Sequence, residues 1–222
     1  MPKCFRFRHT YTDDRGTQQR PEFRCLLSSR QCSAKTSRTQ ERCRNNVVMG
    51  LPFCYAHTPT ELNVMIKPST RNGRDGKGVF AYNPRINAGR VFEAGEQVLT
   101  LKGQLRSTEQ MIRRYGDIEE SSQPYGIQIS AQRWIDGACL RGIGMMINHA
   151  PASRSNVGLW PVTQRGSNRV VIIIRAVKNI NQGTELLMDW SIFQRKPWLG
   201  QQTHRTYDCA GTNTWLRGYV NK

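Results

Sequence analysis

Short apolar runs separated by turn residues fill the middle of this sequence and constrain its fold more than any other feature. Strand patterns occur at residues 63–67, 78–81, 97–101, 125–130, 134–136, 157–162, 169–176 and 185–190. Turn dipeptides such as Asn72-Gly73 and Asp75-Gly76 lie between such runs. Many short strands with little helical pattern predict a mostly β (α+β) domain built from several small sheets.

One segment has a clear helical signature. Ser107 and Gln110 have the spacing of a capping box, in which each side chain accepts a hydrogen bond from the other residue's backbone N–H. The apolar residues expected on its buried face are Met111, Ile112 and Tyr115. The helix is expected to end near Gly116, and the Gly-rich run at 137–147 predicts a buried turn or short helix.

The first 58 residues contain five of the seven cysteines and two of the four histidines, and they show no long apolar periodicity. A segment this small and polar buries too little apolar surface to be stable alone, so we expect a metal to organise it. Cys32, Cys43 and Cys54 are separated by ten residues each, and His57 follows Cys54 after two. This Cys₃His set predicts a tetrahedral zinc site resembling a zinc knuckle.

Other readings of the cysteines stay open. The cysteines of the Cys₃His set could instead be reduced structural thiols without a metal. Cys4 and Cys25, with or without His9, could contribute to a second site, although four ligands cannot be named. The first ten residues are charged and show no secretory signal. In a reducing compartment, cysteines are expected to be thiols or metal ligands rather than disulfides.

The chain carries 33 Lys and Arg against 16 Asp and Glu, a formal net charge of +17. Such an excess attracts polyanions, so it favours nucleic acid or a nucleoprotein as a partner; the alternative is a generically basic surface. The longest strongly apolar run, 170–174, is too short to span a bilayer. We expect an intracellular protein, nuclear or cytoplasmic, that is neither secreted nor bound to a membrane.

Four motifs in a fixed order carry a family resemblance. They are Gly76-Lys77-Gly78-Val79-Phe80-Ala81, Ile135-Asp136, Ile147-Asn148-His149 with Asn156, and Gly183-Thr184-Glu185-Leu186-Leu187-Met188-Asp189-Trp190. Together they resemble the SET domain, a family of protein-lysine methyltransferases, over about residues 62–198. The corresponding division of the chain is a zinc-knuckle-like segment at 1–60, a SET domain at 61–198 and a tail at 199–222.

The resemblance implies a SET-type fold with a C-terminal pseudoknot and S-adenosylmethionine as the methyl donor. The residues implied to bind the donor are Gly76, Lys77, Gly78, Val79, Asn148, His149 and Trp198. Tyr125 is the implied lining of a channel for the target lysine. Trp190 occupies the position of the family's catalytic tyrosine, but an indole has no hydroxyl and cannot accept a hydrogen bond.

The function expected from this resemblance is methyl transfer from S-adenosylmethionine to a lysine of a histone or another nucleic-acid-associated protein. The alternative is a weakened or inactive SET-like binding or adaptor module, and Trp190 is the reason for it. A third reading is a nucleic-acid-binding protein without a donor site.

Overall fold

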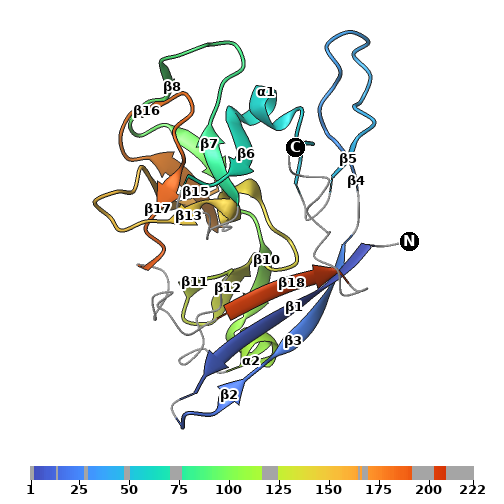
Figure 1. The fold of residues 1–222 in the computed structure, drawn as a ribbon, viewed down its shortest axis with the longest axis vertical. Coiled ribbons are helices and arrows are strands. Elements are labelled where there is room, and N and C mark those ends of the chain that lie inside the picture. The colour runs from blue at the N-terminus through green and yellow to red at the C-terminus, as the bar shows by residue number, and fades with distance from the viewer. Residues whose placement is uncertain are drawn as a thin grey trace. The chain divides into compact units, whose positions relative to one another are not determined.

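The structure is a computed structural model that describes residues 3–13, 15–27, 30–47, 51–70, 77–116, 125–164, 166, 170–191 and 203–208 (Figure 1). Strands in several small sheets dominate these residues, which confirms the predicted mostly β architecture. The implied C-terminal pseudoknot would be formed by the part of the chain after Ser191. Most of that part lies outside the described residues. No helix among the described residues is long and apolar enough to cross a membrane.

The chain forms two compact units, each assembled from separate stretches. Unit 1 comprises Met1–Ser29, Gly103–Arg141 and Trp190–Arg217, and unit 2 comprises Arg30–Lys102, Gly142–Asp189 and Gly218–Lys222. The division into a segment, a SET domain and a tail at residues 60 and 198 stays a prediction.

Two sheets and one helix build unit 1. The first sheet contains β1 (Lys3–Thr12), β2 (Gln18–Gln19), β3 (Glu22–Leu27) and β18 (Thr203–Asp208), with β1 lying between β18 and β3 (Figure 1). The second contains β10 (Gln104–Ser107), β12 (Arg133–Asp136) and β11 (Gly126–Ser130) in that order. Helix α2 (Thr108–Tyr115) follows β10 directly.

The capping box predicted for α2 is present: Gln110 N donates to Ser107 Oγ at 3.2 Å, and Ser107 N donates to Gln110 Oε1 at 3.1 Å. Met111 and Tyr115 are fully buried, as expected. The prediction for Ile112 is wrong, since this side chain is 44% exposed. Successive side chains on a helix are rotated by about 100°. Ile112, one residue after Met111, therefore lies outside the buried stripe.

The long strand β1 was not foreseen. Phe5 and Phe7 alternate with arginines in the sequence, which is a period-two pattern typical of a half-buried strand. β1 pairs with β3 in antiparallel register, with Phe7 opposite Phe23. Part of the N-terminal region is therefore organised by strand pairing as well as by its cysteines.

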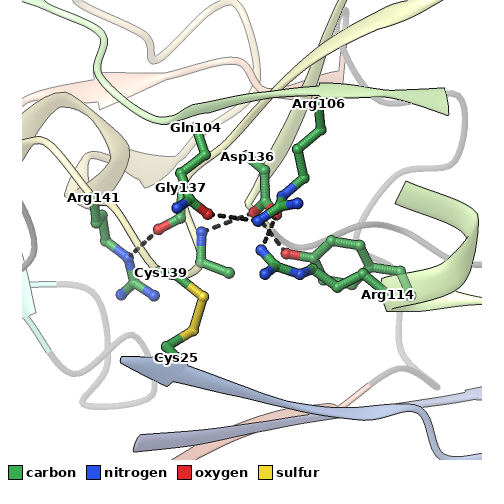
Figure 2. The surroundings of a disulfide bond; sticks show 10 residues. Cys25, Gln104, Arg106, Arg114, Asp136, Gly137, Cys139 and Arg141 are labelled. Atoms are coloured by element: carbon green, nitrogen blue, oxygen red, sulfur yellow. Dashed lines mark hydrogen bonds and ion pairs between the residues drawn. A yellow bond between two sulfur atoms is a disulfide. The ribbon is translucent and has the colours of Figure 1, made fainter. Parts of the chain in front are cut away.

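The expectation for two cysteines is also wrong. Cys25 on β3 and Cys139 form a disulfide across 114 residues of sequence, within unit 1 (Figure 2). Cys25 is therefore not available as a ligand of a second metal site. Nothing in the sequence indicates this pairing, because the two residues meet only through the tertiary fold.

Unit 2 is built around a five-stranded sheet with the order β13, β17, β14, β15, β9. These strands are β13 (Asn148–His149), β17 (Leu187–Met188), β14 (Val157–Thr163), β15 (Val170–Ala176) and β9 (Gln97–Thr100). β15 lies between two partners, as its continuous apolar run predicted. The strand predicted at 185–190 is shorter than expected, since only Leu187 and Met188 pair as a strand.

The remaining elements of unit 2 pair as short two-stranded ladders or form helical turns. They are β4 (Arg30–Gln31) with β5 (Asn46–Val47), β6 (Val64–Pro68) with β7 (Lys77–Ala81), β8 (Arg90–Phe92) with β16 (Ile180–Asn181), α1 (Thr58–Leu62) and the 3₁₀ turn η1 (Ile143–Met146). Val79, Phe80 and Ala81 of β7 are fully buried, as are Ile174 and Leu186.

Candidate functional site

The predicted Cys₃His set is gathered in one place. The ligand atoms of Cys32, Cys43, Cys54 and His57 all lie within 4.8 Å of one another, and the three cysteines are buried. Cys43 Sγ lies 4.0 Å from Cys54 Sγ, and His57 Nδ1 lies 3.3 Å from Cys54 Sγ and 3.8 Å from Cys32 Sγ. A zinc tetrahedron with bonds of about 2.3 Å has edges of about 3.8 Å, so the four residues fit zinc.

A hairpin and a tight turn bring these ligands together. Cys32 N donates to Asn45 O at 2.8 Å and Cys43 N donates to Ala34 O at 2.8 Å, so Cys32 and Cys43 lie on adjacent arms. His57 N donates to Cys54 O at 3.1 Å, which closes the turn between the other two ligands. Two of the four candidate ligands therefore come from one turn, as the Cys-x-x-His spacing predicted.

The surroundings of Cys54 favour a thiolate. Burial opposes the charged sulfur, but hydrogen bonds from the Asn45 side chain and from His57 outweigh it and lower the pKa of Cys54 to about 6. Asn45 Nδ2 lies 3.5 Å from Cys54 Sγ, and Cys54 N donates to Cys32 Sγ at 3.3 Å. Donors aimed at sulfur are typical of the outer shell of a metal–thiolate centre.

A second assembly joins the distant motifs of unit 2. β7 pairs with β6 on one side. On its other side, Ala81 N donates to Thr184 O at 2.9 Å and Leu186 N donates to Val79 O at 2.7 Å. The Gly-x-Gly strand and the Gly-x-Glu-Leu run are thus adjacent, although about 100 residues separate them in the sequence.

The Asn-His pair is attached to the same run. β13 and β14 both pair in parallel with β17, with Asn148 opposite Leu187 and His149 opposite Met188. Asn148 Nδ2 donates to Lys77 O at 3.1 Å and to Glu185 Oε1 at 2.9 Å. Both amide hydrogens are therefore used inside the protein, which leaves Oδ1 as the acceptor that Asn148 can offer a ligand.

Glu185 is the polar centre of this assembly, and its role was not foreseen from the sequence. The side chain is 6% exposed. Its Oε1 also accepts from Ser69 Oγ at 2.8 Å, and its Oε2 accepts from Thr70 N at 2.9 Å and Thr70 Oγ1 at 2.6 Å. Burial opposes the carboxylate, but these hydrogen bonds outweigh it and hold the pKa of Glu185 below the usual glutamate value.

Gly78 is required by this centre. A Cβ at this position would lie 2.9 Å from the Glu185 carboxyl carbon and 3.2 Å from Asn148 Nδ2. The resemblance implies Gly78 as a donor-binding residue. In the structure, the absent side chain makes room for Glu185 itself.

The side chain of Asn156 hydrogen-bonds the backbone of the Gly-x-Glu-Leu run, which carries Glu185. Its Nδ2 donates to Glu185 O at 2.7 Å, and its Oδ1 accepts from Leu187 N at 2.8 Å. Asn156 is 5% exposed, so these bonds satisfy buried backbone groups where strand pairing is interrupted. Nearby, His149 Nδ1 lies 3.8 Å from Asp189 Oδ1, with 43% of the histidine side chain exposed.

The other predicted site residues are distributed differently. Tyr125 and Trp190 belong to unit 1, where the Arg141 guanidinium lies 3.6 Å from the centre of the Tyr125 ring. Gly76 and Trp198 lie outside the described residues. The structure thus brings Lys77, Gly78, Val79, Asn148 and His149 together in unit 2, while the catalytic roles of Tyr125 and Trp190 stay predictions.

Some solved structures resemble this chain. One is Chaetomium thermophilum Polycomb Repressive Complex 2 bound to GSK126, at 25% identity over 59% of this chain and 16% of that chain, with a TM-score of 0.48. Another is ctPRC2 in an autoinhibited conformation bound to S-adenosylmethionine, at 24% identity over 62% of this chain and 16% of that chain, with a TM-score of 0.49. This chain therefore spans about one sixth of the length of these proteins.

No curated protein matches this chain in sequence. The family model of the SET domain matches residues 76–191, which is more than half of the chain. This match begins at the Gly-x-Gly motif and ends just after Trp190, so it contains β7, the Asn-His pair and the Glu185 run described above. The chain therefore belongs to the SET-domain family.

Proposed function

We propose that this protein is a protein-lysine N-methyltransferase that uses S-adenosylmethionine. The proposal rests chiefly on one observation: in a chain of the SET family, the Asn148 amide joins Lys77 of the Gly-x-Gly strand to Glu185 of the Gly-x-Glu-Leu run. Lys77 and Asn148 are among the residues that the resemblance implies as the donor site, and Glu185 connects them to a third motif of the family.

The residues present suit a cationic donor. S-adenosylmethionine carries an ammonium and a sulfonium group, and its sulfonium would supply an electrophilic methyl group. Asn148 Oδ1 can accept from the ammonium, and the Glu185 carboxylate contributes negative charge close to β7. Gly76, Lys77, Gly78, Val79, His149 and Trp198 complete the proposed donor site. The protein's task is then to align and desolvate the two reactants.

The proposed substrate is a lysine on a histone or another nucleic-acid-associated protein. A formal charge of +17 on 222 residues favours partners that accompany polyanions. The target amine must be neutral to react, and an apolar channel lined by Tyr125 would lower its pKa by desolvation. We place this activity inside the cell, in the nucleus or cytoplasm.

Trp190 supports a second function. Its indole has no hydroxyl, and it is bulkier than the tyrosine expected at this position. A narrowed or blocked lysine channel would leave a SET-like binding or adaptor module that recognises a partner without turnover. The face of an indole can still hold a cation, so binding of a lysine is compatible with this alternative.

Zinc is the proposed metal of the Cys₃His cluster formed by Cys32, Cys43, Cys54 and His57. Four ligands from the protein leave no open position, so the role is structural rather than catalytic. Metal binding would organise the segment from Arg30 to His57, whose only regular strands are β4 and β5 among the described residues.

Isothermal titration calorimetry with S-adenosylmethionine tests the main proposal. Binding in the micromolar range is expected, followed by transfer of a labelled methyl group to protein in a histone or nucleoprotein extract. Absence of binding at millimolar donor would contradict the methyltransferase proposal. Binding of the donor without transfer would favour the module that has lost turnover.

A further inference from the structure

An open depression of about 310 Å³ in unit 1 is lined by cationic and amide side chains and one aromatic ring. Its lining residues are Phe23 of β3, Arg106 of β10, and Gln110, Arg113 and Arg114 of α2. No carboxylate is among these lining residues. The motifs that define the family do not include any of them, so the function proposed above gives the depression no role.

One buried carboxylate holds two of the arginines in place. Asp136 is fully buried and accepts from Arg106 Nε at 3.0 Å and from Arg114 Nη1 (Figure 2). The side chains of Arg106 and Arg114 are only 19% and 14% exposed. Two guanidinium groups on one carboxylate leave an excess positive charge in a region partly removed from water, where a fixed charge acts more strongly.

Further contacts restrain the same guanidinium groups. Arg106 Nη2 donates to Gln104 Oε1 at 2.7 Å. The Arg114 guanidinium lies 4.3 Å from the centre of the Phe23 ring, which itself meets Tyr115 edge to face at 5.3 Å. Side chains that are already immobilised lose little entropy when a ligand arrives, so these arginines are preorganised.

Arg113 and Gln110 add groups that can reach a ligand. Arg113 is exposed on α2 and makes no ion pair with another described residue. Gln110 uses its Oε1 in the capping box, so its Nε2 hydrogens remain as donors. The depression therefore presents three guanidinium groups and an amide, and the buried Asp136 carboxylate pairs with two of these guanidinium groups.

We propose that this depression, which we call the Arg106–Arg114 pocket, binds a phosphodiester of a nucleic-acid backbone. Guanidinium forks match the oxygens of a phosphate and form charge-assisted pairs with it. A net charge of +17 favours a polyanion over a single acidic side chain. The volume is at the lower end of small-ligand pockets and suits one phosphate with its sugar rather than a folded partner. The proposal does not depend on methyl transfer.

Two single substitutions test the pocket with little risk to the fold. Arg113→Gln removes a charge from an exposed side chain. Gln110→Glu adds a negative charge to the pocket and keeps the capping box, because glutamate is equally suited to that position. Arg85→Gln and Gln18→Glu make the same charge changes at exposed positions outside the pocket and serve as matched controls.

The probes are a mixed-sequence DNA duplex and a single-stranded RNA, both labelled and about 20 nucleotides long, titrated with the full chain by fluorescence anisotropy. Each pocket variant is expected to bind the probe roughly tenfold more weakly than its control. The negative slope of log K against log salt should become less steep by about one. The probe whose affinity depends on the pocket identifies the source of the phosphodiester.

Two results would overturn the proposal. One is that neither probe binds the pocket variants more weakly than it binds Arg85→Gln and Gln18→Glu, while circular dichroism shows all four folded. The other is that polyglutamate binds in a pocket-dependent manner and neither nucleic acid does, since this would assign the pocket to an acidic protein segment.

Discussion

Asn148 Nδ2 donates to Glu185 Oε1 at 2.9 Å, and the same nitrogen donates to Lys77 O at 3.1 Å. One amide therefore ties together three segments that lie at residues 77, 148 and 185 of the chain. Hydrogen bonds to a charged acceptor are roughly twice as strong as neutral ones, so the ionised Glu185 makes this junction rigid.

Replacing Glu185 with glutamine is expected to loosen the junction. The glutamine amide keeps one acceptor oxygen, but its NH₂ group takes the place of the other. That NH₂ group must face either the donors of Thr70 or the donors of both Ser69 and Asn148. Leaving buried donors unpaired costs about 1–3 kcal/mol, so the free energy of unfolding in urea should fall by that amount and S-adenosylmethionine should bind more weakly. Glu61→Gln, at an exposed glutamate, is the control and should change stability by less than about 0.5 kcal/mol.

The same carboxylate predicts a pH dependence. The pKa of Glu185 is lowered in the folded state, so its ionised form contributes stability above the usual glutamate value of about 4.3. This contribution to stability is lost gradually as the pH falls from the usual glutamate pKa through the lower pKa that Glu185 has in the folded protein. The difference in unfolding free energy between wild type and Glu185→Gln, measured by urea titration from pH 7 to pH 3, should therefore shrink below pH ~4. A constant difference would contradict the assignment of Glu185 as an ionised group.

The contacts around Glu185 separate features that local sequence patterns predict from features that they do not. The strand at β7, the helix α2 with its capping box, and the Cys₃His cluster follow from local spacing, and the structure confirms each of them. The hydrogen bonds of Glu185 to Ser69 and Thr70 span more than 110 residues of sequence and have no local pattern. Contacts of this kind depend on the tertiary fold, so a motif can indicate that Glu185 matters without indicating its partners.

The N-terminal region shows a different limit. Its cysteines indicated metal ligands, whereas the strand β1 was indicated only by the alternation of Phe5 and Phe7 with arginines. The Cys25–Cys139 disulfide joins positions 114 residues apart, and an odd number of cysteines gives no indication of a pairing. The spacing of Cys32, Cys43, Cys54 and His57 did predict that these side chains cluster, because a tetrahedral metal site would need four of them close together.

Gly78→Ala is expected to disturb the same centre by collision. The new Cβ would approach the Glu185 carboxyl carbon to 2.9 Å, and overpacking of this kind costs about 1–3 kcal/mol. Glu185→Asp shortens the obstructing side chain by one methylene. The double variant Gly78→Ala/Glu185→Asp should therefore lose less unfolding free energy than the sum of the two single losses. Additive losses in urea unfolding would show that Gly78 and Glu185 do not compete for the same space.

Zinc removal is expected to unfold the segment around Cys54. The purified chain should contain about one zinc per molecule, measured by atomic emission, and Cys54→Ser should lower that content strongly because a hydroxyl is a poor substitute for thiolate. A chelator should lower the thermal stability of the wild type more than that of Cys54→Ser. Cys139→Ser is the control. Cys139 lies outside the cluster, so the zinc content of this variant should equal that of the wild type. Native protein without metal would leave only reduced thiols at this position.

Trp190→Tyr separates the two proposed functions. If the indole limits turnover, the hydroxyl of tyrosine should raise methylation of a histone or nucleoprotein extract by roughly tenfold or more, measured with labelled S-adenosylmethionine. Donor affinity should change little, because Asn148 and Lys77 are untouched. Trp160→Tyr makes the same exchange at a tryptophan that is 37% exposed and should leave methylation unchanged. Equal activity of Trp190→Tyr and wild type would show that this aromatic residue does not limit the reaction. Donor binding without methylation in both would favour the binding module instead.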